Sequence, residues 1–246
     1  MLQNRTAVVT GAAGGIGSAL TAHLLSEGAA VIAVDLGAKA LEKLRQSDLN
    51  NSRLVTIAGN ITDEGECARI ADQVAKGFDD VHILVNCAGL FPPCAFEKMN
   101  FAEWRRIMAV NLDGVFLMTS AILPLMKNNG YGRIINIGSS SYFQGTPNYV
   151  HYVAAKAGVI GFTRSLAREV GAYGITANVV APGLTSTQFV LDSTSEAFLE
   201  SRRVQRSIQR HQYPKDVVGT ILFLCSAASD FVTGQTIVVD GGAVFN

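Results

Sequence analysis

A tyrosine and a lysine, Tyr152 and Lys156, stand four positions apart in a segment with a helical pattern. Residues at positions i and i+4 of a helix share a face, so both side chains can point into one cleft. A free tyrosine has a pKa of about 10, so little phenolate exists near neutral pH. A nearby cation favours the phenolate, and such a pair can exchange a proton with an oxygen atom of a substrate.

Ser139 adds a hydroxyl directly after an apolar run at residues 133–137. This hydroxyl can hold a substrate oxygen within reach of Tyr152. On spacing alone, however, a tyrosine four residues before a lysine is most commonly an ordinary pair on a helix surface. The catalytic interpretation therefore depends on whether the rest of the chain provides a cofactor site.

A glycine-rich turn, Thr10-Gly-Ala-Ala-Gly-Gly-Ile-Gly17, connects an apolar run at residues 6–10 to a helical pattern at residues 18–27. Glycines permit a tight turn and let a diphosphate approach the free N–H groups of the helix N-terminus. Such a cluster alone can be no more than a turn. Here a second apolar run, residues 30–35, ends in Asp35, about 20 residues after the glycines, where a carboxylate can bind ribose hydroxyls.

Asp35 also indicates which dinucleotide is bound. A carboxylate at this position accepts hydrogen bonds from the free 2′-hydroxyl of NAD and repels the 2′-phosphate of NADP. Neither Gly14, before Gly15, nor Leu36, after Asp35, offers a cation for that phosphate, and we expect the nearest one, Lys39, to lie on a solvated helix face. The sequence therefore predicts NAD as the cofactor.

The composition narrows the class of protein. The chain has 246 residues, of which 48% are hydrophobic and 16% charged, enough for one globular domain that covers residues 1–246. Its formal charge is zero and no basic run is dense, so we expect no nucleic-acid partner and no membrane surface.

We expect a cytoplasmic protein. The first residues lead straight into a strand, which leaves no room for a signal peptide, and we expect no apolar stretch to approach the roughly 20 residues of a membrane span. The four cysteines have neither metal-ligand spacing nor the pattern of a disulfide framework. We therefore predict reduced thiols and no metal.

Apolar strands alternate with amphipathic helices, which predicts an α/β fold with one Rossmann-type, doubly wound parallel sheet of about seven strands. Two of the helical patterns cover residues 101–127 and 149–170. Residues 185–212 break the alternation, and we expect them to form a lid over the substrate. The predicted strands are residues 6–10, 30–35, 54–58, 83–86, 133–137, 176–181 and 236–239.

With these residues assembled, the chain resembles the short-chain dehydrogenase/reductase family along essentially its whole length. The shared motifs are Thr10-Gly-x-x-x-Gly-x-Gly17, Asn86-Cys-Ala-Gly89, Asn111, Ser139, Tyr152-x-x-x-Lys156, Asn178 with Pro182-Gly183, and Thr233-Gly-Gln-Thr with Asp240-Gly-Gly.

The resemblance implies a catalytic tetrad. Tyr152 would be the acid and base, Ser139 would orient the substrate oxygen, and Lys156 would bind the nicotinamide ribose and lower the pKa of the tyrosine. Asn111 would kink its helix and hold a water molecule that relays protons from Lys156.

The same resemblance, together with the glycine motif, implies a set of cofactor contacts. Asn60 and Ile61 would border the adenine, Asn86, Ala88 and Gly89 the adenosine side, and the stretch after Pro182 the carboxamide. The full predicted set is Gly11, Gly14, Gly15, Ile16, Gly17, Asp35, Leu36, Asn60, Ile61, Asn86, Ala88, Gly89, Tyr152, Lys156, Pro182, Gly183, Thr185 and Thr187.

Two loops that line the substrate pocket in relatives are rich in aromatic residues here, which predicts an apolar pocket. These aromatics could equally pack under the lid or at a subunit contact. The predicted pocket residues are Phe91, Pro92, Ser141, Tyr142, Phe143 and Leu184.

Three arginines, Arg202, Arg206 and Arg210, recur at helical spacing in the lid, opposite Leu199, Val204 and Ile208. They could capture an anionic substrate, but we expect a solvated helix face, which is the more common origin of such a stripe. We expect His151 to be structural, because it would point away from the cleft.

Three functions remain open. The first is an NAD-dependent dehydrogenase of a secondary alcohol, acting reversibly on the ketone. The second is a 3-oxoacyl-carrier-protein reductase using NADPH, because residues 132–139 and 158–183 are similar to that subfamily. Asp35 and the arginine-poor stretches at residues 127–130 and 171–173 argue against it. The third is a dinucleotide-sensing regulator, which an intact tetrad makes improbable.

By resemblance alone, we expect a homotetramer in which the two long helices pair across a two-fold axis. The apolar stripe of the second helix, Ala155, Val159, Phe162 and Leu166, could equally be internal core.

Overall fold

The strands are runs of apolar, mostly β-branched residues that end at glycines or polar residues. In the computed structural model, which describes residues 2–47 and 52–245, they form one parallel sheet with the order β3-β2-β1-β4-β5-β6-β7. This confirms the predicted fold class. The strands are β1 (Thr6–Thr10), β2 (Ala30–Asp35), β3 (Leu54–Ala58), β4 (Ile83–Asn86), β5 (Gly132–Ile137), β6 (Ile175–Pro182) and β7 (Thr236–Val239).

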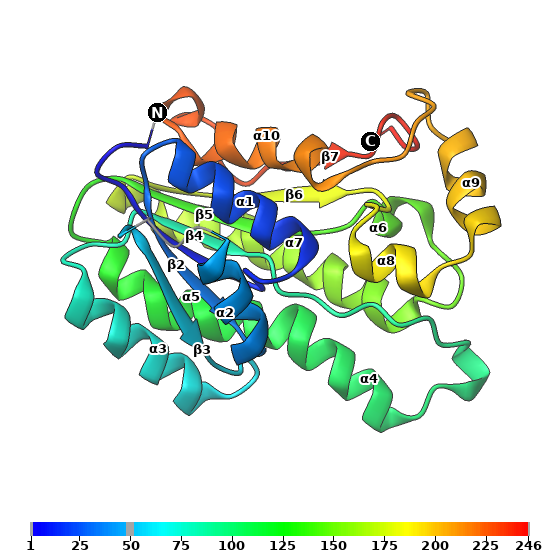
Figure 1. The fold of residues 1–246 in the computed structure, drawn as a ribbon, viewed down its shortest axis with the longest axis horizontal. Helices are drawn as coiled ribbons and strands as arrows, with labels where there is room; N and C mark the ends of the chain where they lie inside the picture. The colour runs from blue at the N-terminus through cyan, green and yellow to red at the C-terminus, as the bar shows by residue number, and fades with distance from the viewer. Residues whose placement is uncertain (1, 48–51, 246) are drawn as a thin grey trace.

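Helices cover both faces of the sheet (Figure 1). The longer ones are α1 (Gly15–Ser26), α2 (Ala38–Gln46), α3 (Glu64–Gly77), α4 (Phe101–Met108), α5 (Gly114–Met126), α7 (Val150–Val170), α9 (Glu196–Val204) and α10 (Pro214–Cys225). The shorter ones are η1 (Phe96–Lys98), the π-helix η2 (Ala109–Asp113), α6 (Ser141–Gln144), η3 (Gly171–Tyr173), α8 (Gln188–Ser193) and η4 (Ala227–Ser229).

Successive residues of a strand point to opposite faces of the sheet, and this alternation divides the core in two. Ala7 and Val9 of β1 pack with the buried side chains of α1 and α10 on one face. Val8 packs on the other face with those of α3 and α5. The sheet is therefore apolar on both faces, as a parallel sheet covered by helices requires.

The run Phe101–Met126, made of α4, η2 and α5, is long and apolar enough to cross a membrane by length and composition alone. The expectation that no stretch approaches this length was therefore wrong. Met118 and Ile122 of this run are fully buried in the core that lies against α3 and the sheet. A core helix passes the same composition test, and 39% of the apolar window of this run is buried inside the protein.

The carboxyl ends of the strands meet the segment predicted as a lid, residues 185–212. It contains α8 and α9, and a bridge between Thr185 and Gln212 joins its two ends. After β7 the chain turns at Asp240, whose carboxylate accepts hydrogen bonds from the N–H groups of Gly242, Ala243 and Val244. This turn brings the residues after β7 beside the lid (Figure 1).

Candidate active site

The glycine turn after β1 is shaped by close backbone contacts. Gly11 has a φ of +63°, and a Cβ atom there would lie 2.6 Å from the Cα atom of Ala88. A Cβ atom on Gly17 would collide with the carbonyl oxygen of Gly11. A side chain at either position would therefore force the turn apart.

Two polar side chains fix the surroundings of this turn. The Thr10 hydroxyl accepts hydrogen bonds from the N–H groups of Cys87 (3.1 Å) and Ala88 (3.2 Å), which holds the loop after β4 beside the turn. The carboxylate of Asp35 accepts one from Ala13 N–H and one from Gly37 N–H, both at 3.0 Å. Each carboxylate oxygen still has a lone pair for a ligand.

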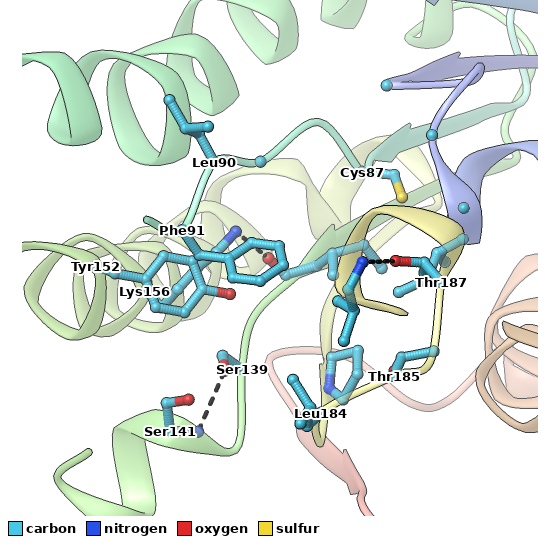
Figure 2. A pocket seen from close by; sticks show the side chains of 18 of the residues that line it. Cys87, Leu90, Phe91, Ser139, Ser141, Tyr152, Lys156, Leu184, Thr185 and Thr187 are labelled. Carbon is cyan, nitrogen blue, oxygen red and sulfur yellow. Dashed lines mark hydrogen bonds between the residues drawn. The ribbon is translucent and has the colours of Figure 1, made fainter. Parts of the chain in front are cut away.

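Ser139, Tyr152 and Lys156 converge in the pocket (Figure 2). Tyr152 and Lys156 lie one turn apart on α7, and the Lys156 Nζ atom is 5.7 Å from the centroid of the tyrosine ring. Lys156 is only 2% exposed and donates a hydrogen bond to the carbonyl oxygen of Ile137 at 2.7 Å. The Ser139 Oγ atom accepts a hydrogen bond from Ser141 N–H at 3.1 Å.

Burial dominates the electrostatics of the pair. It raises the pKa of Tyr152 to about 12, although the hydrogen bond with Ser139 acts in the opposite direction. Burial also lowers the pKa of Lys156 to about 8. The pKa of Tyr152 is thus raised, contrary to the expectation that Lys156 lowers it, because desolvation of the phenol is the largest effect.

Asn111 lies in the π-helix η2, at the point where the sequence predicted a kink. Its amide group is fully buried and donates hydrogen bonds to the carbonyl oxygens of Leu90 (2.8 Å) and Ile107 (3.0 Å). A Cβ atom on Gly89 would be 3.2 Å from the Asn111 Oδ1 atom and 3.8 Å from the Lys156 Nζ atom. Asn111 therefore lies next to the pocket wall, close to the lysine.

A cavity of about 620 Å³ connects the glycine turn to Tyr152. Most of the predicted site residues line it. They are Gly11, Gly14, Gly15, Ile16, Gly17, Asp35, Leu36, Asn60, Ile61, Ala88, Gly89, Phe91, Ser139, Ser141, Tyr152, Lys156, Pro182, Gly183, Leu184, Thr185 and Thr187.

Five predicted residues do not line the cavity: Asn86, Pro92, Asn111, Tyr142 and Phe143. The Asn86 amide instead donates hydrogen bonds to Thr119 and Asn136 inside the core. The rings of Tyr142 and Phe143 pack against each other, with centroids 4.9 Å apart.

The pocket is apolar, as predicted, and of the three aromatic residues predicted for it Phe91 lines it, whereas Tyr142 and Phe143 do not. The ring of Phe91 lies 5.9 Å from that of Tyr152 and 5.8 Å from that of Phe189 in the lid, so it both lines the pocket and packs under the lid. Tyr149, whose ring is 6.3 Å from Tyr152, was missed by the sequence analysis. Its place three residues before Tyr152, on the same helix face, was the available signal. Other lining residues that were not predicted include Gln144, Thr146, Val190, Phe198, Gln205 and Ala243.

The predicted arginine stripe does not exist, because α9 ends at Val204. Arg206 is 5% exposed and donates hydrogen bonds to the carbonyl oxygens of Leu184 and Arg210, so a solvated face was the wrong interpretation for it. Arg210 pairs with Asp216 on the surface. Arg202 and Arg206 both line the pocket.

His151 is fully buried outside the pocket lining. Its Nδ1 atom accepts a hydrogen bond from Tyr152 N–H at 2.9 Å, and its Nε2 atom lies 3.8 Å from a carboxylate oxygen of Glu103. The His151 ring therefore interacts with the first turn of α7 and with the first turn of α4.

Comparisons with known proteins agree with this geometry. Residues 11–244 match the model of a family described as enoyl-(acyl carrier protein) reductase. The chain is 34% identical over 244 residues to the 3-oxoacyl-[acyl-carrier-protein] reductase FabG of Thermotoga maritima, with 99% of both chains covered.

Two further proteins are similar. The (2S)-[(R)-hydroxy(phenyl)methyl]succinyl-CoA dehydrogenase subunit BbsD of Thauera aromatica is 39% identical, over 98% of this chain and 97% of its own length. The crystal structure of a short-chain dehydrogenase/reductase from Brucella melitensis, titled glucose/ribitol dehydrogenase, superposes with a TM-score of 0.94 at 31% identity, covering 100% of this chain and 98% of that one.

Proposed function

Because the chain belongs to the short-chain dehydrogenase/reductase family, and is an oxidoreductase of that family, we propose that it interconverts a hydroxyl and a carbonyl group on an acyl thioester. The observation that carries the proposal is the single cavity that joins the glycine turn and Asp35 to Ser139, Tyr152 and Lys156. The thioester comes from the names of the relatives, which include a carrier-protein reductase and a CoA-thioester dehydrogenase. These names favour a thioester substrate over the free secondary alcohol that the sequence analysis placed first.

The residues present fit a nicotinamide dinucleotide. No side chain caps the N-terminus of α1, so its N–H groups remain available for a diphosphate, and a Cβ atom on Gly14 or Gly15 would narrow the approach. Asp35 would hold the adenosine ribose and Lys156 the nicotinamide ribose. When bound, the nicotinamide supplies the hydride for reduction or takes it up in oxidation.

In reduction, Ser139 holds the carbonyl oxygen by a hydrogen bond and Tyr152 gives its phenolic proton to that oxygen. The positive charge of Lys156 stabilises the phenolate that remains. The raised pKa of Tyr152, about 12, keeps the phenol protonated at neutral pH, which suits a proton donor.

The proposed cofactor is NAD(H). Its support is the Asp35 carboxylate in the pocket wall. The cations among the described lining residues are Lys156, Arg202 and Arg206, which contact β5 or the lid rather than the end of β2. An NADPH-linked carrier-protein reductase is the second candidate, favoured by the name of the Thermotoga relative.

We also propose a cytoplasmic homotetramer with a small-molecule substrate and neither a nucleic-acid nor a membrane partner. Phe116 of α5 is 55% exposed, and its ring packs edge-on against that of Phe162 of α7, with centroids 6.5 Å apart. An apolar patch shared by these two helices is suited to contact with a second subunit.

The test follows the absorbance of the reduced nicotinamide, with NADH and NADPH supplied separately. Substrates are a 3-oxoacyl thioester and a free ketone of matched carbon chain. Faster turnover of the thioester with NADH supports the proposal. Turnover of the ketone alone would restore the secondary-alcohol function, and thioester reduction with NADPH alone would refute the NAD assignment.

A further inference from the structure

The substrate end of the pocket carries positive charge that its lining does not balance. Three cations line the pocket, Lys156, Arg202 and Arg206, whereas Asp35 is the one acidic residue among the described residues that line it. Lys156 and Arg206 already donate hydrogen bonds to backbone carbonyl oxygens. Arg202 is therefore the cation with the most donors left for a ligand.

Arg202 lies half-buried on α9, with its guanidinium carbon 4.9 Å from the ring centroid of Phe198. Its hydrogen bond is to the side-chain oxygen of Gln205, at 3.3 Å, and no acidic side chain among residues 2–47 and 52–245 forms a salt bridge with it. A guanidinium has five N–H donors in a planar fork, so most of them remain available. Stacking on an aromatic ring holds such a fork in one orientation.

Arg202 lies near the reacting groups. Burial raises the pKa of the Tyr149 phenol, and the charge of Arg202 opposes that shift, so the two side chains are close enough to interact. The ring of Tyr149 in turn lies 6.3 Å from that of Tyr152. Arg202, Tyr149 and Tyr152 line the same pocket, together with Phe91 and Phe189, whose ring centroids lie 5.8 Å apart.

We infer that the acyl part of the substrate carries a carboxylate, which Arg202 binds while Ser139 and Tyr152 hold the reacting oxygen. The inference rests on the proposed thioester oxidoreductase activity and adds the class of acyl group. The planar fork matches the two oxygens of a carboxylate, and one positive charge balances it. A phosphodiester of a thioester carrier also bears one negative charge, so the test below separates a carboxylate of the acyl group from a phosphate of the carrier.

The test uses two 3-oxoacyl thioesters of N-acetylcysteamine with equal chain length, one ending in a carboxylate and one in a methyl group. Neither contains a phosphate. Wild-type protein is expected to have the higher kcat/KM for the carboxylate-ended thioester. Arg202→Gln should reduce the ratio of the two kcat/KM values on the order of 10- to 100-fold, as for the loss of a charged hydrogen-bonding partner.

Arg203 provides a matched control. It is the next residue on α9, carries the same charge, lies outside the pocket lining and pairs with Glu200. Arg203→Gln should leave the ratio as in the wild type. Arg202→Lys should restore part of it, because the charge returns without the planar fork.

Two outcomes would overturn the inference while leaving the proposed function intact. One is that Arg202→Gln lowers kcat/KM by the same factor for both thioesters of N-acetylcysteamine. The other is that Arg202→Gln lowers kcat/KM selectively for the CoA thioester of the methyl-ended chain. The anion that Arg202 binds would then be a phosphate of the carrier. If wild-type protein reduces no thioester at all but does reduce ketones, the proposed function itself fails.

Discussion

At the scale of single residues, the site combines two opposed pKa shifts with one cause. Burial raises the pKa of Tyr152 to about 12 and lowers that of Lys156 to about 8. Both shifts disfavour charge inside the closed pocket. The free protein therefore holds a neutral phenol beside an ammonium group that loses its proton under mildly alkaline conditions.

Replacement of Tyr152 by Phe tests the proton donor. The change removes the phenolic oxygen and leaves the ring packed against Phe91. We expect turnover to fall roughly 100- to 10,000-fold, the usual contribution of a general acid, with the dissociation constant of NADH nearly unchanged. Single-turnover kinetics and a fluorescence titration with NADH measure the two quantities. Wild-type turnover in this variant would remove Tyr152 from the mechanism.

The pH dependence tests Lys156. In the proposed mechanism the ammonium form of Lys156 is the active one. This form prevails below the pKa of about 8, so kcat/KM for reduction should be flat below that pH and fall as the pH rises through it. Lys156→Arg should move the fall to higher pH, because a guanidinium keeps its charge. A wild-type profile without an inflection in this range would show that this ionisation does not limit activity.

The residues that sequence reasoning found are those with a fixed spacing or a motif, such as Tyr152 with Lys156 and Asp35 after its strand. Tyr149 was missed, and Arg202 was assigned to a solvated helix face, because the place of each in the pocket depends on how the lid folds. The direction in which the pKa of Tyr152 shifts could not be predicted either, because the degree of burial cannot be read from a spacing.

At the scale of elements, the glycine turn and the π-helix both depend on backbone geometry. Gly11 adopts a left-handed conformation against Ala88, and the π-helix holds Asn111 against the loop at Leu90. These two irregular segments bring the loop after β4 to the pocket from both sides. The loop is therefore held by contacts from the segments around it, which include the Thr10 hydroxyl and the Asn111 amide.

Gly11→Ala is expected to destabilise the protein by about 1–3 kcal/mol, because the new Cβ atom meets Ala88 and the residue keeps a positive φ. NADH binding should weaken as the turn opens. Gly219→Ala is the control, since it lies within α10 with nothing within 4 Å of its Cβ position. Urea denaturation should find that control neutral or stabilised. Equal stability of the two variants would contradict the role given to Gly11.

The strands could be predicted almost to the residue, because their apolar runs end at glycines and polar residues. The ends of the lid helices could not. The arginine spacing of residues 202–210 continued a helical pattern, yet α9 stops at Val204 and the chain then turns back to pair Ser207 and Ile208 with the loop after β7. That tertiary pairing leaves no trace in the local pattern. The local pattern of residues 101–127 likewise shows no interruption at Asn111, and the kink there was expected from the family resemblance alone.

At the scale of the whole molecule, cofactor binding should stabilise the folded chain by mass action. NADH is expected to raise the Tm more than NADPH at equal concentration, because Asp35 repels a 2′-phosphate. In Asp35→Ala the difference between the two Tm increases should narrow, even though the loss of two backbone hydrogen bonds lowers the starting Tm. Scanning calorimetry measures both. If Asp35→Ala keeps the wild-type difference between the two Tm increases, another group determines the choice between NADH and NADPH.

The pocket collects residues from position 11 to position 243 of the chain. Ala243 enters its wall only after β7 has paired with β6 and the chain has turned at Asp240. During synthesis, a nascent chain still lacking β7 already holds the glycine turn, Ser139, Tyr152 and Lys156, but one side of their cavity is open to water. We therefore expect activity to appear only after β7 has joined the sheet.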